Sequence, residues 1–140
     1  MKKRLLISAC LLGVPCRYDG KSKPSEAAIA LGERYELVPF CPECYGGLPT
    51  PRPPAEICGE AVLTADGRDV TAEYTRGAES ALALCQALGI QDACLKSRSP
   101  SCGAREIYDG TFSGTRVLGS GVTVRLLQKN GIRVFSEEEL

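Results

Sequence analysis

The chain of 140 residues contains no histidine. Histidine is the commonest general base and the commonest neutral metal ligand, and every serine or cysteine triad built on imidazole needs one. Its absence excludes those triads. The search for catalytic groups therefore turns to carboxylates, hydroxyls and thiols.

The sequence also lacks a net charge and a long apolar segment. Its 17 Lys and Arg residues balance 17 Asp and Glu residues, so no excess charge is available to hold a nucleic-acid backbone or an anionic membrane. The apolar stretches are too short for a membrane helix or a signal-peptide core. We therefore expect a cytoplasmic protein with no nucleic-acid or membrane partner, folded as a single domain over residues 1–140.

Cysteine, in contrast, is abundant. Eight cysteines stand at positions 10, 16, 41, 44, 58, 85, 94 and 102, and without an export signal they are expected to be reduced thiols. Cys85 lies on the apolar stripe of a predicted helix, Cys94 inside a predicted strand and Cys58 in a predicted loop. We interpret these three as structural residues.

Hydrophobic patterning predicts strands and helices in alternation. Apolar runs predict strands at 5–9, 35–40, 90–95 and 132–135, with a smaller one at 60–63. Helices are predicted from the Ser25 cap to Gly32, from Asp69 to Gly89 and over 120–130. This order predicts an α/β fold, a small Rossmann-like three-layer sandwich with a mainly parallel sheet. Residues 39–54 hold six of the nine prolines and are predicted to form a stiff loop without a helix.

Three cysteines follow predicted strands of this sheet. In parallel sheets the ligand site is the crevice beyond the C-terminal strand ends, so Cys10, Cys41 and Cys102 are expected to meet there. Three thiolates from separate strand ends suit an iron–sulfur cluster, because iron in such clusters prefers thiolate ligands. If only three cysteines hold a four-iron cluster, the remaining iron is open and can act as a Lewis acid.

Two other roles for the thiols, in thiol–disulfide exchange and in zinc binding, have weaker support in the sequence. Cys41-Pro-Glu-Cys44 matches the spacing of a thioredoxin-type dithiol, but that chemistry needs a following helix to lower the thiol pKa, and none is predicted. A zinc ribbon needs a second close cysteine pair, which the sequence lacks. Cys16 and Cys44 could each be a fourth cluster ligand or a reactive thiol.

Several side chains near these cysteines are candidates for catalysis. Glu43 is the natural acid or base in a protein without histidine, and its alternative role is that of a solvated loop residue. Ser99 and Ser101 could bind or protonate a substrate, or could simply form turns. Five basic residues could hold an anionic or carbonyl-bearing substrate, or solvate loops: Arg17, Arg52, Lys96, Arg98 and Arg105.

Three segments taken together resemble the thiouracil desulfurase family. They are Ser-Ala-Cys-Leu-Leu-Gly at 8–13 with Arg-Tyr-Asp-Gly at 17–20, Cys-Pro-Glu at 41–43 with Gly-Gly-Leu at 46–48 and Pro-Arg at 51–52, and Leu-Lys at 95–96 with Ser-Pro-Ser-Cys-Gly at 99–103. The resemblance continues into Ile-Tyr-Asp-Gly-Thr-Phe at 107–112 and Gly-Val-Thr at 121–123. It covers nearly the whole chain.

The resemblance implies a 4Fe-4S cluster held by Cys10, Cys41 and Cys102, with an open iron that accepts sulfur from a thiolated nucleobase such as 2-thiouracil without net redox change. It also implies that Glu43 and one of Ser99 and Ser101 are catalytic. The substrate is then a small thiolated base, and the activity belongs to sulfur metabolism. The rival hypothesis is a non-catalytic iron–sulfur or thiol module that delivers iron or sulfur to a partner. The oligomeric state stays open.

Overall fold

A four-stranded parallel sheet forms the centre of the molecule. The structure, a computed structural model, describes residues 2–140. The sheet has the strand order β2 (Tyr35–Phe40), β1 (Lys3–Ser8), β5 (Asp92–Leu95) and β8 (Arg133–Ser136), and all neighbouring strands are parallel. The predicted α/β fold with a mainly parallel sheet is confirmed.

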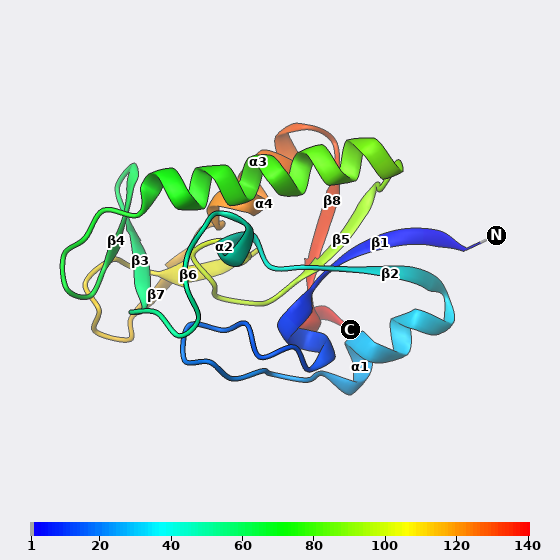
Figure 1. Ribbon diagram of the computed structural model, residues 1–140, viewed down its shortest axis with the longest axis horizontal. Coiled ribbons are helices and arrows are strands. Elements are labelled where there is room, and N and C mark those ends of the chain that lie inside the picture. Colours follow the sequence, from blue (N-terminus) through cyan, green and yellow to red (C-terminus); the bar gives the residue numbers. More distant parts are fainter. Residues whose placement is uncertain (1) are drawn as a thin grey trace.

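Helices cover both faces of this sheet. The helices α3 (Thr71–Leu88) and α4 (Val122–Lys129) pack on one face, and α1 (Glu26–Ala30) with the 3-10 turns η1 (Ala9–Leu12) and η2 (Leu31–Glu33) packs on the other. Figure 1 shows α3 and α4 above the strands and α1 below them. The predicted three-layer sandwich is therefore confirmed as well.

The central strand β1 shows why helices must pack on both faces of the sheet. Leu6 packs toward α3 and α4, whereas Leu5 and Ile7 pack toward α1, and all three are 0% exposed. Side chains alternate across a strand, so a continuous apolar run is the expected sequence of a strand buried on both faces.

The longest helix, α3, begins and ends where the sequence indicated. The Asp69 carboxylate accepts a hydrogen bond from the Thr71 backbone N–H at 2.9 Å, and Gly89 ends the helix with a φ of 69° in the left-handed region. Its buried stripe includes Ala78, Ala81 and Cys85. Within residues 2–140, no helix combines the length and hydropathy that crossing a membrane requires.

One prediction for the proline-rich segment is wrong, because a helix does follow Cys41. The short helix α2 (Pro42–Tyr45) has its proline in the first turn, where a missing backbone N–H removes no helical hydrogen bond. It packs directly on α3: a Cβ atom on Gly77 would lie 2.0 Å from the Pro42 carbonyl oxygen. Only glycine permits this approach.

Two antiparallel hairpins were incompletely predicted. They pair β3 (Ala55–Cys58) with β4 (Ala61–Thr64), and β6 (Glu106–Tyr108) with β7 (Arg116–Leu118). Figure 1 shows both hairpins at the end of the molecule opposite the start of β1. Cys58 ends β3 instead of lying in a loop, and its thiol donates to the Gly110 carbonyl at 3.4 Å. The strand predicted at 60–63 corresponds to β4, whereas β3, β6 and β7 were missed because these short strands lack a clear apolar run or alternation.

Candidate functional site

The C-terminal edge of the sheet gathers the cysteine-bearing segments. β1 leads into η1, which carries Cys10, and β2 leads directly into Cys41. β5 leads into the turn segment 97–103, which carries Cys102. Because the strands are parallel, all three segments leave the sheet at the same edge.

Five cysteines lie near one another at this edge. The thiols of Cys10 and Cys41 lie close enough to that of Cys16 to shift its pKa, and the Cys41 and Cys44 thiols each donate to the Cys16 carbonyl oxygen at 3.8 Å. Cys102 lies close enough to Cys41 for their charges to interact. The structure thus brings together the three predicted ligands and both of the thiols whose roles were left open.

The other three cysteines have structural surroundings. Cys85 and Cys94 are 1% and 0% exposed and belong to the apolar core, and Cys58 contacts backbone carbonyls of the hairpin region. All eight cysteines are free thiols.

The clustered thiols resist ionisation in the absence of a positive partner. Contact with Cys16, followed by burial, raises the pKa of Cys41 well above that of an ordinary thiol. Contact with Cys10 raises the pKa of Cys16 to about 11, and burial raises the pKa of Cys102 to about 12. A thioredoxin-type thiol needs the opposite shift. Iron would supply the positive charge that lets such thiols bind as thiolates.

The chemistry of the grouped cysteines fits an iron–sulfur cluster. Their donor atoms are soft sulfur atoms, the ligands that iron in such clusters prefers. Among residues 2–140, no three cysteine or carboxylate side chains are placed to hold a single metal ion.

Glu43 lies on α2 beside the thiols and is held by three side chains. Its Oε1 accepts hydrogen bonds from Arg52 Nε at 3.2 Å and from the Tyr74 hydroxyl at 2.6 Å. Its Oε2 lies 3.5 Å from the Ser99 hydroxyl. With its side chain only 16% exposed, Glu43 is not a solvated loop glutamate.

The two candidate serines have different surroundings. The Ser99 hydroxyl faces Glu43 and also accepts from the backbone N–H groups of Ser101 and Cys102, both at 3.1 Å. Ser101 is 0% exposed, and its hydroxyl pairs with that of Thr123 at 2.7 Å. Ser99 therefore connects Glu43 to the Cys102 turn, whereas Ser101 connects that turn to α4.

Arg52 joins the loops of the site. Its side chain is 4% exposed, and its Nη2 donates to the Cys16 carbonyl at 2.9 Å while its Nη1 donates to Pro49 O and Thr50 Oγ1 at 3.1 and 3.0 Å. Burial alone would lower the pKa of Arg52, but the charge of Glu43, the charges of Cys41 and Cys44 and the hydrogen bond to Glu43 together outweigh burial, and the net pKa is raised. A permanent cation therefore ties the Cys16 loop to Glu43.

Tyr74 is the site residue that the sequence did not reveal. Helical periodicity assigns it to the apolar stripe of α3, where its ring does lie, and nothing local indicates that its hydroxyl reaches Glu43 31 positions away. Burial, followed by the negative charge of Glu43, raises the pKa of Tyr74. The phenol therefore stays protonated and remains a hydrogen-bond donor.

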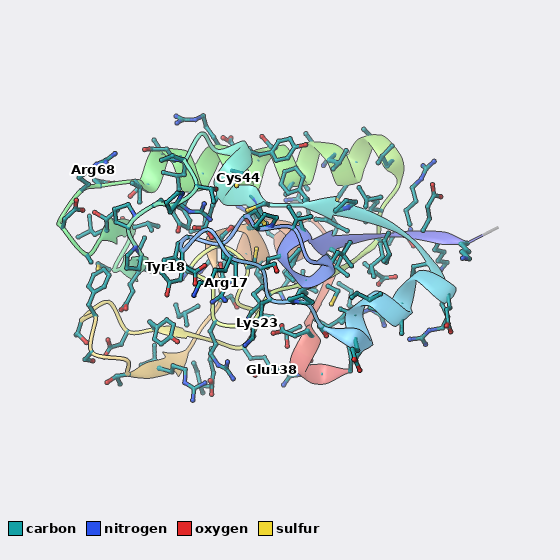
Figure 2. All side chains as sticks on the ribbon, turned by 60° about the horizontal axis from the view of Figure 1, so that its bottom comes forward. Arg17, Tyr18, Lys23, Cys44, Arg68 and Glu138 are labelled. Carbon is teal, nitrogen blue, oxygen red and sulfur yellow. The ribbon has the colours of Figure 1, made fainter. Side chains whose placement is uncertain are left out.

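The remaining basic candidates lie outside this network. Arg17 stacks over the exposed Tyr18 ring at 5.9 Å, and Figure 2 shows both residues on the loop beyond Cys16, on the side of the molecule that also carries Cys44. Two hollows of about 540 and 640 Å³ lie elsewhere, one beside Lys2 and Tyr35 and the other beside Arg98, Arg105 and Arg116.

The other three basic candidates form ion pairs with the last turn of the chain, η3 (Glu137–Glu139). Lys96 pairs with Glu137, Arg98 with Glu138 and Arg105 with Glu139. These pairs hold both ends of the segment that carries Ser99 and Cys102.

Glu137 is expected to stabilise this segment in a pH-dependent manner. Its Oε1 accepts from Ser97 N–H at 2.8 Å and its Oε2 from the Ser97 hydroxyl at 2.9 Å, with Lys96 Nζ at 3.2 Å. Burial alone would raise the pKa of Glu137, but these partners outweigh burial and lower the pKa below the usual value of a glutamate. Because the pKa of Glu137 is lower in the folded protein, its ionised side chain stabilises the fold fully at pH values above its pKa in the unfolded chain. This stabilisation is lost as the pH falls through the folded-state pKa. Glu137→Gln should lower the free energy of unfolding by about 1–2 kcal/mol at pH 7, with a smaller deficit at pH 3.

Urea unfolding of iron-free protein at both pH values measures this effect without interference from acid release of iron. Glu138→Gln is the matched control, because the Glu138 side chain is 49% exposed and exposed ion pairs contribute little. Equal losses from the two variants, or a deficit for Glu137→Gln that does not shrink at pH 3, would contradict the assignment.

The fold and the site together define an α/β protein with a group of cysteines at the C-terminal edge of its parallel sheet. The sequence model of the 2-thiouracil desulfurase family matches residues 5–139. A Bacillus subtilis (strain 168) protein described as uncharacterized protein YbbK is 44% identical, with 97% of each chain covered. The chain belongs to the 2-thiouracil desulfurase family, which confirms the resemblance inferred from its motifs.

A solved structure agrees with this membership. The 4Fe-4S-dependent thiouracil desulfidase TudS is similar to this chain with a TM-score of 0.94 and 56% sequence identity, covering 99% of this chain and 93% of that one. The similarity therefore extends over the sheet, the hairpins and the site.

Proposed function

We propose that the protein is an iron–sulfur-dependent desulfidase that removes sulfur from a thiolated nucleobase such as 2-thiouracil. In this reaction the carbon–sulfur double bond is replaced by a carbon–oxygen double bond. Water supplies the oxygen, the sulfur leaves as hydrogen sulfide with the two protons of that water, and no electrons are gained or lost. The family membership and the group of five neighbouring cysteines beside the partly buried carboxylate of Glu43 support this proposal.

Cys10, Cys41 and Cys102 are the residues that we assign to a 4Fe-4S cluster. They come from three separate strand ends, and the thiol set matches the ligand preference of iron. When bound, a cluster with one iron free of cysteine supplies a Lewis acid for the substrate sulfur. The desulfidase TudS, which carries 4Fe-4S in its name, supports the same cofactor here.

Glu43 and Ser99 are the proposed catalytic side chains. Glu43 Oε2 would take a proton from the attacking water and return it to the departing sulfur, because Oε1 is already bonded by Arg52 and Tyr74. Ser99 Oγ, 3.5 Å from Oε2, would position the attacking water or the substrate nucleobase. We assign Ser101 the supporting role of holding the Cys102 turn against α4, since its hydroxyl pairs with Thr123.

A small substrate and a cytoplasmic location agree with the chemistry of the chain. The formal net charge of zero offers no general attraction for nucleic acid. Eight free thiols are typical of a protein in a reducing compartment. The rival hypothesis of a non-catalytic delivery module requires a cluster closed by a fourth cysteine, and Cys16 and Cys44 both lie within the thiol group.

Anaerobic assay of the cluster-loaded protein tests the proposal. We expect 2-thiouracil to be converted to uracil with release of one sulfide per base, and we expect iron-free protein to be inactive. Chromatography of the bases and colorimetric measurement of sulfide follow the two products. Loaded protein that releases no sulfide from any thiolated base, or turnover that does not depend on iron, would contradict the function.

A further inference from the structure

Tyr74 combines a ring in the core with a hydroxyl in the site. The residue is 2% exposed, and its ring belongs to the apolar cluster that includes Val62, Val70 and Ile107. Packing of the ring on α3 therefore fixes where the hydroxyl lies. That hydroxyl donates to Glu43 Oε1 at 2.6 Å, the shortest of the three side-chain contacts of this carboxylate.

The helices that carry the two residues are held together through glycines. A Cβ atom on Gly46 would lie 2.0 Å from the Glu73 carbonyl oxygen, and one on Gly77 would lie equally close to the Pro42 carbonyl oxygen. The Arg76 guanidinium adds a hydrogen bond to the Gly46 carbonyl at 3.1 Å. The end of α2 is thus pressed onto the turn of α3 that carries Tyr74, so the distance between Tyr74 and Glu43 is set by backbone packing.

The two oxygens of Glu43 are unequally occupied. Oε1 accepts from both Tyr74 and Arg52, which uses the two lone pairs of a carboxylate oxygen. Oε2 has only the long contact of 3.5 Å with Ser99. Rotation of the carboxylate would break both hydrogen bonds to Oε1, one of them from a cation, so this rotation is opposed.

We propose that Tyr74 is a positioning residue for the desulfidase reaction, which holds Glu43 so that Oε2 is the oxygen that handles the proton. This inference rests on the proposed function. Tyr74 does not touch the substrate; it acts through Glu43. Arg52 holds the same oxygen but also ties the Cys16 loop, whereas Tyr74 has no second polar contact among the described residues. Tyr74 is therefore the residue whose removal affects the carboxylate alone.

Tyr74→Phe tests the inference, because it keeps the buried ring and removes only the hydroxyl. We expect kcat for sulfide release to fall roughly tenfold or more, since small errors in the placement of a catalytic group cost rate. KM, iron content and the far-ultraviolet circular dichroism should stay unchanged. In a Glu43→Gln background the same substitution should cause no additional loss, since a residue acting through Glu43 has nothing left to position.

Tyr45→Phe is the matched control, because Tyr45 also lies on α2 but is 66% exposed and stacks on Phe40. It should leave kcat unchanged. Full activity of Tyr74→Phe, or a further loss in the Glu43→Gln background, would overturn the positioning role.

An infrared measurement provides a readout that does not need turnover. The difference spectrum between wild type and Glu43→Gln isolates the carboxylate bands of Glu43, and Tyr74→Phe should shift those bands whereas Tyr45→Phe should not. Bands that do not move would overturn the inference. Loss of the proposed function would be recognised separately, as a wild-type enzyme that loads its cluster and releases no sulfide.

Discussion

Replacing Cys10, Cys41 or Cys102 singly by alanine is expected to abolish binding of the 4Fe-4S cluster. Each variant would leave only two of the three strand-end thiols, and an iron without its thiolate ligand is readily lost. Iron and acid-labile sulfide, measured after anaerobic reconstitution, should fall to background together with the visible absorption of the cluster. Sulfide release from 2-thiouracil should disappear in parallel.

The other cysteines of the chain are the controls for this experiment. Cys58→Ala, Cys85→Ala and Cys94→Ala should retain the cluster, although the last two remove atoms from a closely packed core and should cost about 1 kcal/mol of stability. Circular dichroism and thermal unfolding of every variant separate loss of ligand from loss of fold. Similar loss of iron in all six variants would show a general folding effect and contradict the assigned ligands.

Cys16→Ala and Cys44→Ala decide between the enzyme and the delivery module. Both thiols lie close to the proposed ligand Cys41, but an open iron requires that neither is a ligand. We expect both variants to retain the cluster. If one of these variants loses the cluster, the replaced cysteine is a fourth ligand and no iron is open to the substrate. That result would support the non-catalytic hypothesis.

The central layer of the fold could be predicted from the sequence because its signals are local. Strands β1 and β2 are short apolar runs, and α3 has a periodic stripe with a cap at Asp69 and a stop at Gly89. The helix α2 was missed because prolines on both sides of Cys41 indicate a loop, and only the approach of Gly77 to Pro42 explains why a helical turn fits there. That approach joins residues far apart in the sequence.

The candidate site could likewise be predicted from the sequence only in part. The thiols could be predicted to meet, since parallel strands end at one edge and Cys10 and Cys41 follow two of them. The surroundings of Glu43 could not be predicted, because Arg52 and Tyr74 reach it through side-chain contacts that leave no pattern in the sequence. Tyr74 in particular occupies a core position by its ring and a site position by its hydroxyl.

Glu43→Gln is expected to keep the cluster and slow sulfide release roughly a hundredfold or more, the usual scale for loss of a positioned acid or base. The hydrogen-bond network explains why the fold should survive. The amide oxygen can take the place of Oε1 and accept from Arg52 and Tyr74, so both hydrogen bonds at that position are kept, while the amide nitrogen lies at the long 3.5 Å contact with Ser99. The substitution therefore removes the proton-accepting oxygen that faces Ser99.

Sulfide release under anaerobic conditions, with iron measured in the same samples, separates loss of chemistry from loss of cofactor. Glu138→Gln makes the same chemical change at a half-exposed residue of η3 and should leave turnover unchanged. Full turnover in a Glu43→Gln variant that carries its cluster would show that Glu43 only braces α2 against Arg52 and Tyr74. Because the chain has no histidine and Glu43 is the carboxylate held beside the thiols, that result would move the proton transfer to Ser99 or to water.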